Sequence, residues 1–146
     1  MKVAEVMTSD VQTVRPDATL QEAAGFMLRA DAGSIPVCDG KRLVGMLTDR
    51  DIAVRAVAEG MGPDTQVNQT MTTTDLLYCF EDDDIEEVAT QMSDRQVRRM
   101  PVVSRDDKSL VGIVSLGDLS RSDDHDSAAL ALDGITDPGG EHNQTQ

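Results

Sequence analysis

The chain has 146 residues, of which 39% are hydrophobic and 27% charged, a composition typical of a soluble globular protein. Its net charge of −14 argues against nucleic acid and anionic membranes as partners, because phosphate contacts need clustered Lys and Arg. With one Tyr, two Phe and no Trp, the core must be built from aliphatic residues and Met.

The N-terminal stretch MKVAEVMTSD lacks the apolar run of a signal peptide, and no segment approaches about 18 consecutive apolar residues. We therefore expect a cytoplasmic protein. Its two cysteines are Cys38 and Cys79. Buried free thiols are the simplest interpretation, and a disulfide or a redox role is the alternative.

The first predicted helix covers residues 19–30, where apolar residues recur at i, i+3, i+4 and i+7, the spacing of one buried stripe. The stripe consists of Leu20, Ala23, Ala24 and Met27. Thr19 and Glu22 predict a capping box at the start of this helix. This helix is followed by two strands, over 34–38 and 43–47, that the turn DGKR joins, and then by a second helix over 49–58.

Residues 59–70, EGMGPDTQVNQT, are predicted to be a linker. A second set of elements follows: a helix over 84–95, strands over 100–104 and 110–114, and a helix over 116–121. The stripe of its first helix is Ile85, Val88, Ala89 and Met92, with Asp84 and Glu87 as the expected capping box. From residue 122 the chain is acidic and Gly-rich, so we expect a disordered tail over 122–146, in which SAALAL (127–132) forms a helical turn or two at most.

The two sets of elements form an internal repeat. The phrase LVGMLTDRDI at 43–52 returns as LVGIVSLGDL at 110–119, and Met7–Thr8 matches Met71–Thr72. Each copy is a β-α-β-β-α unit, with an extended start before its first helix. We therefore predict an α+β fold of two tandem repeats, over residues 1–60 and 61–121, that bury their apolar faces against each other.

A hydroxyl residue and an aspartate recur at the end of each second strand, as Thr48 with Asp51 and as Ser115 with Asp118. Helix capping is one interpretation. Asp is shorter than the Glu of the first helices and less suited to reach back to the cap, which favours a second role. A short carboxylate at a helix entrance is placed to accept hydrogen bonds from the two hydroxyls of a ribose.

Glycines and prolines also recur. Gly45 and Gly112 interrupt apolar strands, where a missing side chain permits the close approach of a backbone or a ligand. Pro36 and Pro101 cannot donate to a sheet ladder, so they belong at a strand start or edge.

An aliphatic residue before Pro, an aliphatic-Gly-aliphatic strand and then T/S-x-x-D, in this order, resemble the CBS domain, named after cystathionine β-synthase. Two tandem copies over about residues 1–121 resemble a CBS pair, or Bateman module, and are similar to the stand-alone bacterial CBS-pair proteins of the hypoxic response type. The resemblance implies two repeats packed about a pseudo-twofold axis. It also implies a non-catalytic sensor that binds AMP, ADP, ATP, NAD(H) or S-adenosylmethionine in clefts between the repeats.

Carried over to this sequence, the resemblance assigns Asp51 and Asp118 to the ribose hydroxyls, and Thr48 and Ser115 to the ribose or α-phosphate. The residues expected to border the adenine are Ser34, Ile35, Pro36, Arg99, Met100 and Pro101. The family also implies a homodimer, and a regulated partner protein is possible.

Arginines distinguish the two copies. Arg98 and Arg99 precede the second aliphatic-Pro motif, where the first copy has Gly33 and Ser34, and Arg50 has Gly117 as its counterpart. Phosphate binding and surface salt bridges to the many acids are equally compatible with these arginines. Their unequal placement predicts unequal sites.

No other motif indicates chemistry. The run EDDD at 81–84 lacks the spacing of a calcium loop, and acids in a first helical turn favour the helix dipole. His125 and His142 have no neighbouring Cys or His, so we expect no metal site. No nucleophile–base set or P-loop is present, and we expect no enzyme. The alternative to a nucleotide sensor is a structural dimerisation or partner-interaction module with vestigial pockets.

Overall fold

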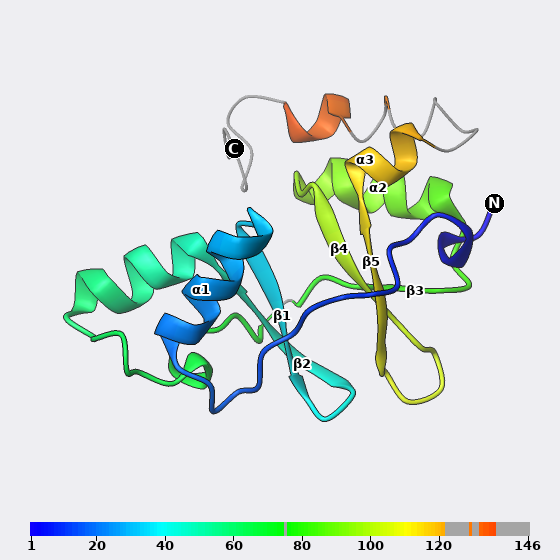
Figure 1. Ribbon diagram of the computed structural model, residues 1–146. Helices are drawn as coiled ribbons and strands as arrows, with labels where there is room; N and C mark the ends of the chain where they lie inside the picture. Colours follow the sequence, from blue (N-terminus) through cyan, green and yellow to red (C-terminus); the bar gives the residue numbers. More distant parts are fainter. Residues whose placement is uncertain (75, 122–128, 130–131, 137–146) are drawn as a thin grey trace. The chain divides into compact units, whose positions relative to one another are not determined.

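The computed structural model describes residues 1–74, 76–121, 129 and 132–136. The chain divides into two compact units with mixed helix and strand content (Figure 1). Gln12–Leu76 form the first-repeat unit. Met1–Val11, together with the chain from Leu77 onward, form the second-repeat unit.

The compact units do not follow the boundary at residues 60 and 61 predicted for the sequence repeats. The extended segment at the start of each repeat packs on the other repeat's sheet. Thr8 exchanges backbone hydrogen bonds of 2.8 and 2.9 Å with Ile113, and Thr72 exchanges bonds of 2.8 and 3.0 Å with Met46. Each segment satisfies backbone groups on the free edge of a second strand, which a sequence-based division by repeats does not reveal.

The first-repeat unit contains helix α1 (Leu20–Ala30) and the antiparallel strands β1 (Ser34–Asp39) and β2 (Arg42–Thr48). These three elements confirm the prediction. The expected first strand is reduced to a single bridge between Val14 and Val37. The predicted helix over 49–58 forms, but it is a π-helix, η2, over Asp51–Ala56, followed by a 3₁₀ turn; the apolar pattern does not distinguish these hydrogen-bond registers.

The second-repeat unit has the complete predicted order. Its elements are, in chain order, strand β3 (Cys79–Phe80), helix α2 (Ile85–Arg95), strands β4 (Arg99–Val103) and β5 (Leu110–Ser115), and helix α3 (Leu116–Ser120). The sheet order is β3-β4-β5, with β3 parallel and β5 antiparallel to β4.

Each unit has its own aliphatic core. All four residues of the α2 stripe are buried, as predicted. Leu20, Ala23 and Met27 of the α1 stripe are buried, whereas Ala24 is exposed, because the buried face of α1 is narrower than the periodicity suggests.

The predicted capping boxes of α1 and α2 are only partly present. Thr19 Oγ1 accepts a 3.1 Å hydrogen bond from the Glu22 amide, as expected. Asp84 makes no side-chain cap to α2 and instead forms a 3.0 Å ion pair with Lys2, so the cap predicted there is wrong. The competing partner comes from the N-terminal segment, which packs on this unit.

Two segments predicted to lack structure carry core residues. In the expected linker, Val67 is fully buried and its amide donates a 2.8 Å hydrogen bond to the Ala18 carbonyl. In the expected disordered tail, residues 132–135 are helical and Ile135 is 3% exposed in the core of the second-repeat unit. Both predictions are wrong for these residues, because single apolar side chains anchor segments of polar composition. The rest of 122–146, including most of SAALAL, His125 and His142, lies outside the described residues.

Gly45 and Gly112 mark close approaches of backbone. A Cβ atom on Gly112 would lie 2.8 Å from the Thr8 carbonyl oxygen and 2.7 Å from Met7 Sδ. On Gly45 it would lie 3.1 Å from the Thr72 carbonyl oxygen and 2.8 Å from Met71 Sδ. Of the two causes left open by the sequence, a backbone or a ligand, the described contacts show a backbone at both glycines: the extended start of one sequence repeat lies against the second strand of the other.

The cysteines are free and buried, at 3% exposure for Cys38 and 1% for Cys79. Burial raises the pKa of Cys38 to about 11 and that of Cys79 to about 12. Both thiols therefore stay protonated at neutral pH and serve as small apolar core groups. Among the described residues, no helix combines the length and apolar character needed to cross a membrane.

Candidate functional site

The repeated hydroxyl–aspartate pairs form two closed capping boxes. In the first-repeat unit, the Asp51 amide donates to Thr48 Oγ1 at 3.0 Å, and the Thr48 amide donates to Asp51 Oδ2 at 3.0 Å. The same two bonds between Ser115 and Asp118 measure 3.1 and 2.9 Å. The expectation that Asp is less suited to reach back is wrong: both carboxylates reach, because the strand ends in extended backbone directly before the helix.

Each aspartate accepts its capping hydrogen bond with one carboxylate oxygen, Oδ2. Both residues are buried, with 8% of Asp51 and 6% of Asp118 exposed. Asp118 Oδ1 accepts a 2.6 Å hydrogen bond from Arg121, whose side chain is 72% exposed. Asp51 is approached by Thr72 Oγ1, at 3.3 Å from Oδ2 and 3.5 Å from Oδ1, and by Arg55 at 3.7 Å. Both aspartates thus have side-chain partners in addition to their caps, and Asp118 itself does not line the pocket described next.

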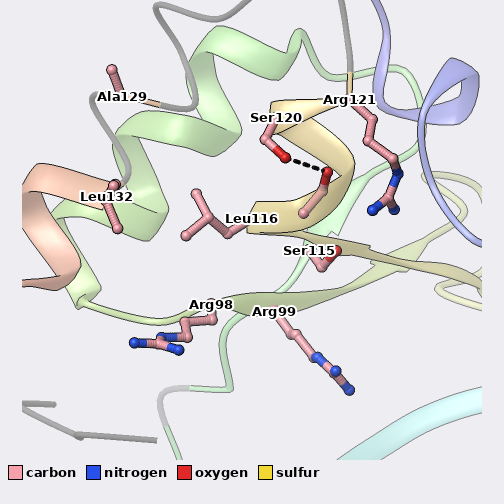
Figure 2. A pocket seen from close by; sticks show the side chains of 9 residues that line it. Arg98, Arg99, Ser115, Leu116, Ser120, Arg121, Ala129 and Leu132 are labelled. Atoms are coloured by element: carbon pink, nitrogen blue, oxygen red, sulfur yellow. Dashed lines mark hydrogen bonds between the residues drawn. The ribbon is translucent and has the colours of Figure 1, made fainter.

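A pocket of about 690 Å³ lies beside the second capping box (Figure 2). It brings together three predicted site residues, Arg98, Arg99 and Ser115. The remaining lining residues were not predicted: Leu116, Gly117, Ser120, Arg121, Ala129 and Leu132. Arg121 was detectable in the sequence, because it stands three residues after Asp118 on the same helical face.

The strand register explains this gathering. Arg99 is the partner of Ser115 across β4 and β5, and the Leu116 amide donates to the Arg98 carbonyl at 2.8 Å. In the other unit, Ser34 is the partner of Thr48, and the Asp49 amide donates to the Gly33 carbonyl at 2.9 Å. Each capping box is therefore held next to the residues that precede its aliphatic-Pro motif.

The aliphatic-Pro residues are buried in their sheets. Met100 is fully buried and Ile35 is 5% exposed, each within the core of its unit. Pro36 and Pro101 are buried at the third position of β1 and β4. At the level of Pro101, β4 pairs only with β5, so the missing amide donor disturbs no ladder. None of these four residues lines the pocket described above.

Arg98 and Arg99 differ from Arg121, the third arginine of the pocket, which is paired with Asp118. Arg98 and Arg99 are exposed and form no ion pair with any residue that the structure describes. Arg50 is likewise exposed at the start of its helix. Among the described residues, neither Arg98 nor Arg99 has the surface salt bridge that was one of the two interpretations.

The sequence model of the CBS-domain family matches the chain twice, over residues 3–57 and 67–124. The chain belongs to the CBS-domain family. The CBS domain-containing protein YhcV of Bacillus subtilis is 42% identical over 135 residues, covering 92% of this chain and 94% of its own length. Hypoxic response protein 1 of Mycobacterium tuberculosis is 38% identical over 118 residues, which cover 80% of this chain and 81% of that protein.

Solved CBS structures share the fold. The crystal structure of Hypoxic Response Protein I with two coordinated zinc ions has a TM-score of 0.74 at 36% identity, covering 83% of this chain and 98% of that one. The CBS domain pair of protein MJ0100, in complex with 5′-methylthioadenosine and S-adenosyl-L-methionine, has a TM-score of 0.70 at 29% identity, covering 83% and 94%. The predicted α+β CBS pair of the hypoxic response type is thereby confirmed.

Proposed function

We propose that this protein is a non-catalytic regulatory module that binds an adenosine-containing ligand. The pocket beside Ser115 carries the proposal, since its volume of about 690 Å³ falls within the range of roughly 300–1,000 Å³ typical of small-molecule sites. Its arginines favour a ligand with an anionic group. The adenosine compounds bound by the CBS pair of MJ0100 support the ligand class.

In this proposal the outer oxygen of Asp118 accepts hydrogen bonds from the ribose hydroxyls, and Ser115 contacts the ribose or the α-phosphate. Arg98 and Arg99 bind the phosphates through charge-assisted hydrogen bonds. Asp51, Thr48 and Arg50 take the corresponding roles in the first-repeat unit. The adenine lies along the residues around the aliphatic-Pro motifs, of which Ser34 and Arg99 are adjacent to the capping boxes.

The two sites are proposed to bind with different affinities. The second-repeat unit presents Arg98 and Arg99 before its aliphatic-Pro motif, whereas Gly33 and Ser34 stand at the matching positions of the first. Phosphorylated ligands therefore bind the second-repeat unit more tightly, and a single high-affinity site per chain is expected.

Calorimetric titration with AMP, ATP, NAD and S-adenosylmethionine tests the proposal. We expect saturable binding of at least one compound, and about a tenfold or greater loss in an Arg98→Ala/Arg99→Ala double variant. Arg95→Ala is the matched control, since Arg95 is exposed at the end of α2 and does not line the pocket. Binding of none of the four compounds would count against the proposal.

A second candidate function is a dimerisation or partner-interaction module with vestigial pockets. The closed capping boxes favour it, because Asp51 and Asp118 already have structural roles that explain their recurrence. Light scattering across a concentration series tests for a homodimer. Retention of the dimer and of a captured partner in a variant that binds no nucleotide would support this candidate over the sensor.

A further inference from the structure

The short helical turn at residues 132–136 is anchored on helix α2. Ile135 is 3% exposed within the same core cluster as Met92. The Gly134 carbonyl accepts a 2.9 Å hydrogen bond from Gln96 Nε2. Gly134 lies so close to α2 that a Cβ atom there would overlap Cα and Oγ of Ser93. The turn is thus held by a buried side chain, a hydrogen bond and a close backbone contact.

The same turn supplies one wall of the pocket that is lined by Arg98, Arg99 and Arg121. Leu132, at the start of the turn, lines the pocket, as does Ala129, which precedes the turn in the chain. Figure 2 shows Leu116 of α3 pointing toward the turn that carries Leu132, with Arg98 below both in this view. Leu132 remains 46% exposed, although it belongs to an otherwise anchored turn. An apolar wall facing cationic side chains suits a ligand that has both an apolar ring and an anionic group.

We propose that ligand binding in this pocket and docking of the turn at 132–136 on α2 favour each other. This inference rests on the proposed function and adds a regulatory role for the C-terminal segment. A ligand in the pocket covers Leu132 only while the turn is docked, so its affinity for the docked state is higher. By linkage, the ligand must strengthen docking by the same factor.

The sign of the coupling follows from the geometry. The pocket has its volume of about 690 Å³ with the turn already docked, so the turn does not fill the site. The anchors, Ile135 and the Gly134 carbonyl, contact the core and Gln96, and neither lines the pocket. A ligand therefore adds contacts to the docked turn and does not compete with it.

Gly134→Ala tests the coupling, because the added methyl group prevents docking against Ser93. We expect AMP or S-adenosylmethionine to bind this variant about five- to tenfold more weakly than the wild type, the effect of leaving half of a leucine side chain uncovered. Two controls should bind as the wild type does. Asp133→Ala alters an exposed side chain of the same turn, and Gly25→Ala adds a methyl group that meets only the end of the Arg29 side chain.

Hydrogen exchange of the full chain gives the reciprocal measurement. Saturating AMP should slow exchange of the amides at 132–136 by the same five- to tenfold factor. If Gly134→Ala fails to fold, Leu132→Ala replaces it, since this half-exposed side chain lines the pocket without anchoring the turn. Equal affinity of the variant and the wild type, or faster exchange with ligand, would overturn the coupling alone. Failure of every compound to bind the wild type would overturn both this inference and the proposed function.

Discussion

Arg121 donates a 2.6 Å hydrogen bond to Oδ1 of Asp118, on the opposite side of the carboxylate from the Ser115 amide. The Asp118 side chain is thereby fixed from within by its capping box and covered from outside by an exposed guanidinium. In the proposed complex, ribose hydroxyls reach Oδ1 only where Arg121 moves away from it. In the proposed complex the released arginine, which already lines the pocket, binds the phosphate of the same ligand.

Arg121→Ala should therefore have opposite effects on ligands with and without phosphate. Loss of the competing guanidinium favours adenosine, whereas loss of a phosphate partner disfavours AMP. We expect the preference for AMP over adenosine to fall about tenfold. Calorimetry with both ligands measures this ratio, and Arg95→Ala is the control. An unchanged ratio would show that Arg121 does not exchange between Asp118 and the ligand.

Asp118 has a structural role that is separable from binding. Asp118→Ala removes the carboxylate from the Ser115 amide and is expected to lower the free energy of unfolding by about 1–2 kcal/mol. Asp118→Asn keeps the shape and one acceptor oxygen, so it should lose less stability while still weakening nucleotide binding. Urea unfolding and calorimetry give the two quantities, with Asp94→Ala on the exposed face of α2 as control. A binding loss that merely follows the loss of stability would contradict a ligand role for Asp118.

The sequence predicted most of the regular structure because it was repeated and strongly periodic. The helices at Leu20–Ala30 and Ile85–Arg95 and all four long strands follow from apolar spacing and turn residues. The predictions that were wrong concern residues whose contacts are made with segments distant in the sequence. Val67 and Ile135 anchor segments whose composition indicates loop, and Asp84 is bonded to Lys2 because the N-terminal segment packs beside it.

The candidate site was predicted only in part, because some of its residues come from segments that are distant in the sequence. The family resemblance named Arg99 and Ser115 separately, and the strand register places them side by side. The aliphatic-Pro residues are largely buried in the sheet, and Leu132 enters the pocket from a distant segment. A repeat pattern carries no information on residues that lie outside the repeat.

The exchanged N-terminal segments make Gly112 and Gly45 intolerant of side chains. Gly112→Ala should cost roughly 1–3 kcal/mol, and Gly45→Ala less, because the Thr8 carbonyl is nearer to the new methyl group than the Thr72 carbonyl is. Urea unfolding of each variant measures the difference. Gly25→Ala is the control, where only a flexible arginine end lies within reach. Equal stability of the Gly112→Ala variant and the wild type would contradict the close packing of the Met7–Thr8 segment on β5.

The buried thiols predict a loss of stability at alkaline pH. Burial raises the pKa values of Cys38 and Cys79 to about 11 and about 12, from an ordinary value of 9.0. The unfolded chain therefore loses these protons first, so their contribution is constant below pH 9 and decreases as pH rises from 9 to 12. The slope of unfolding free energy against pH should be smaller in a Cys38→Ala/Cys79→Ala variant. Rapid reaction of the native protein with a thiol reagent at pH 8 would contradict this burial.

The crystal structure of the protein with AMP bound tests the central claim most directly. The account predicts ribose hydroxyls within about 3 Å of Asp118 Oδ1, phosphate oxygens at Arg98 or Arg99, and Arg121 withdrawn from the carboxylate. A bound AMP that leaves the contact between Arg121 and Asp118 intact and lies away from Ser115 would contradict it.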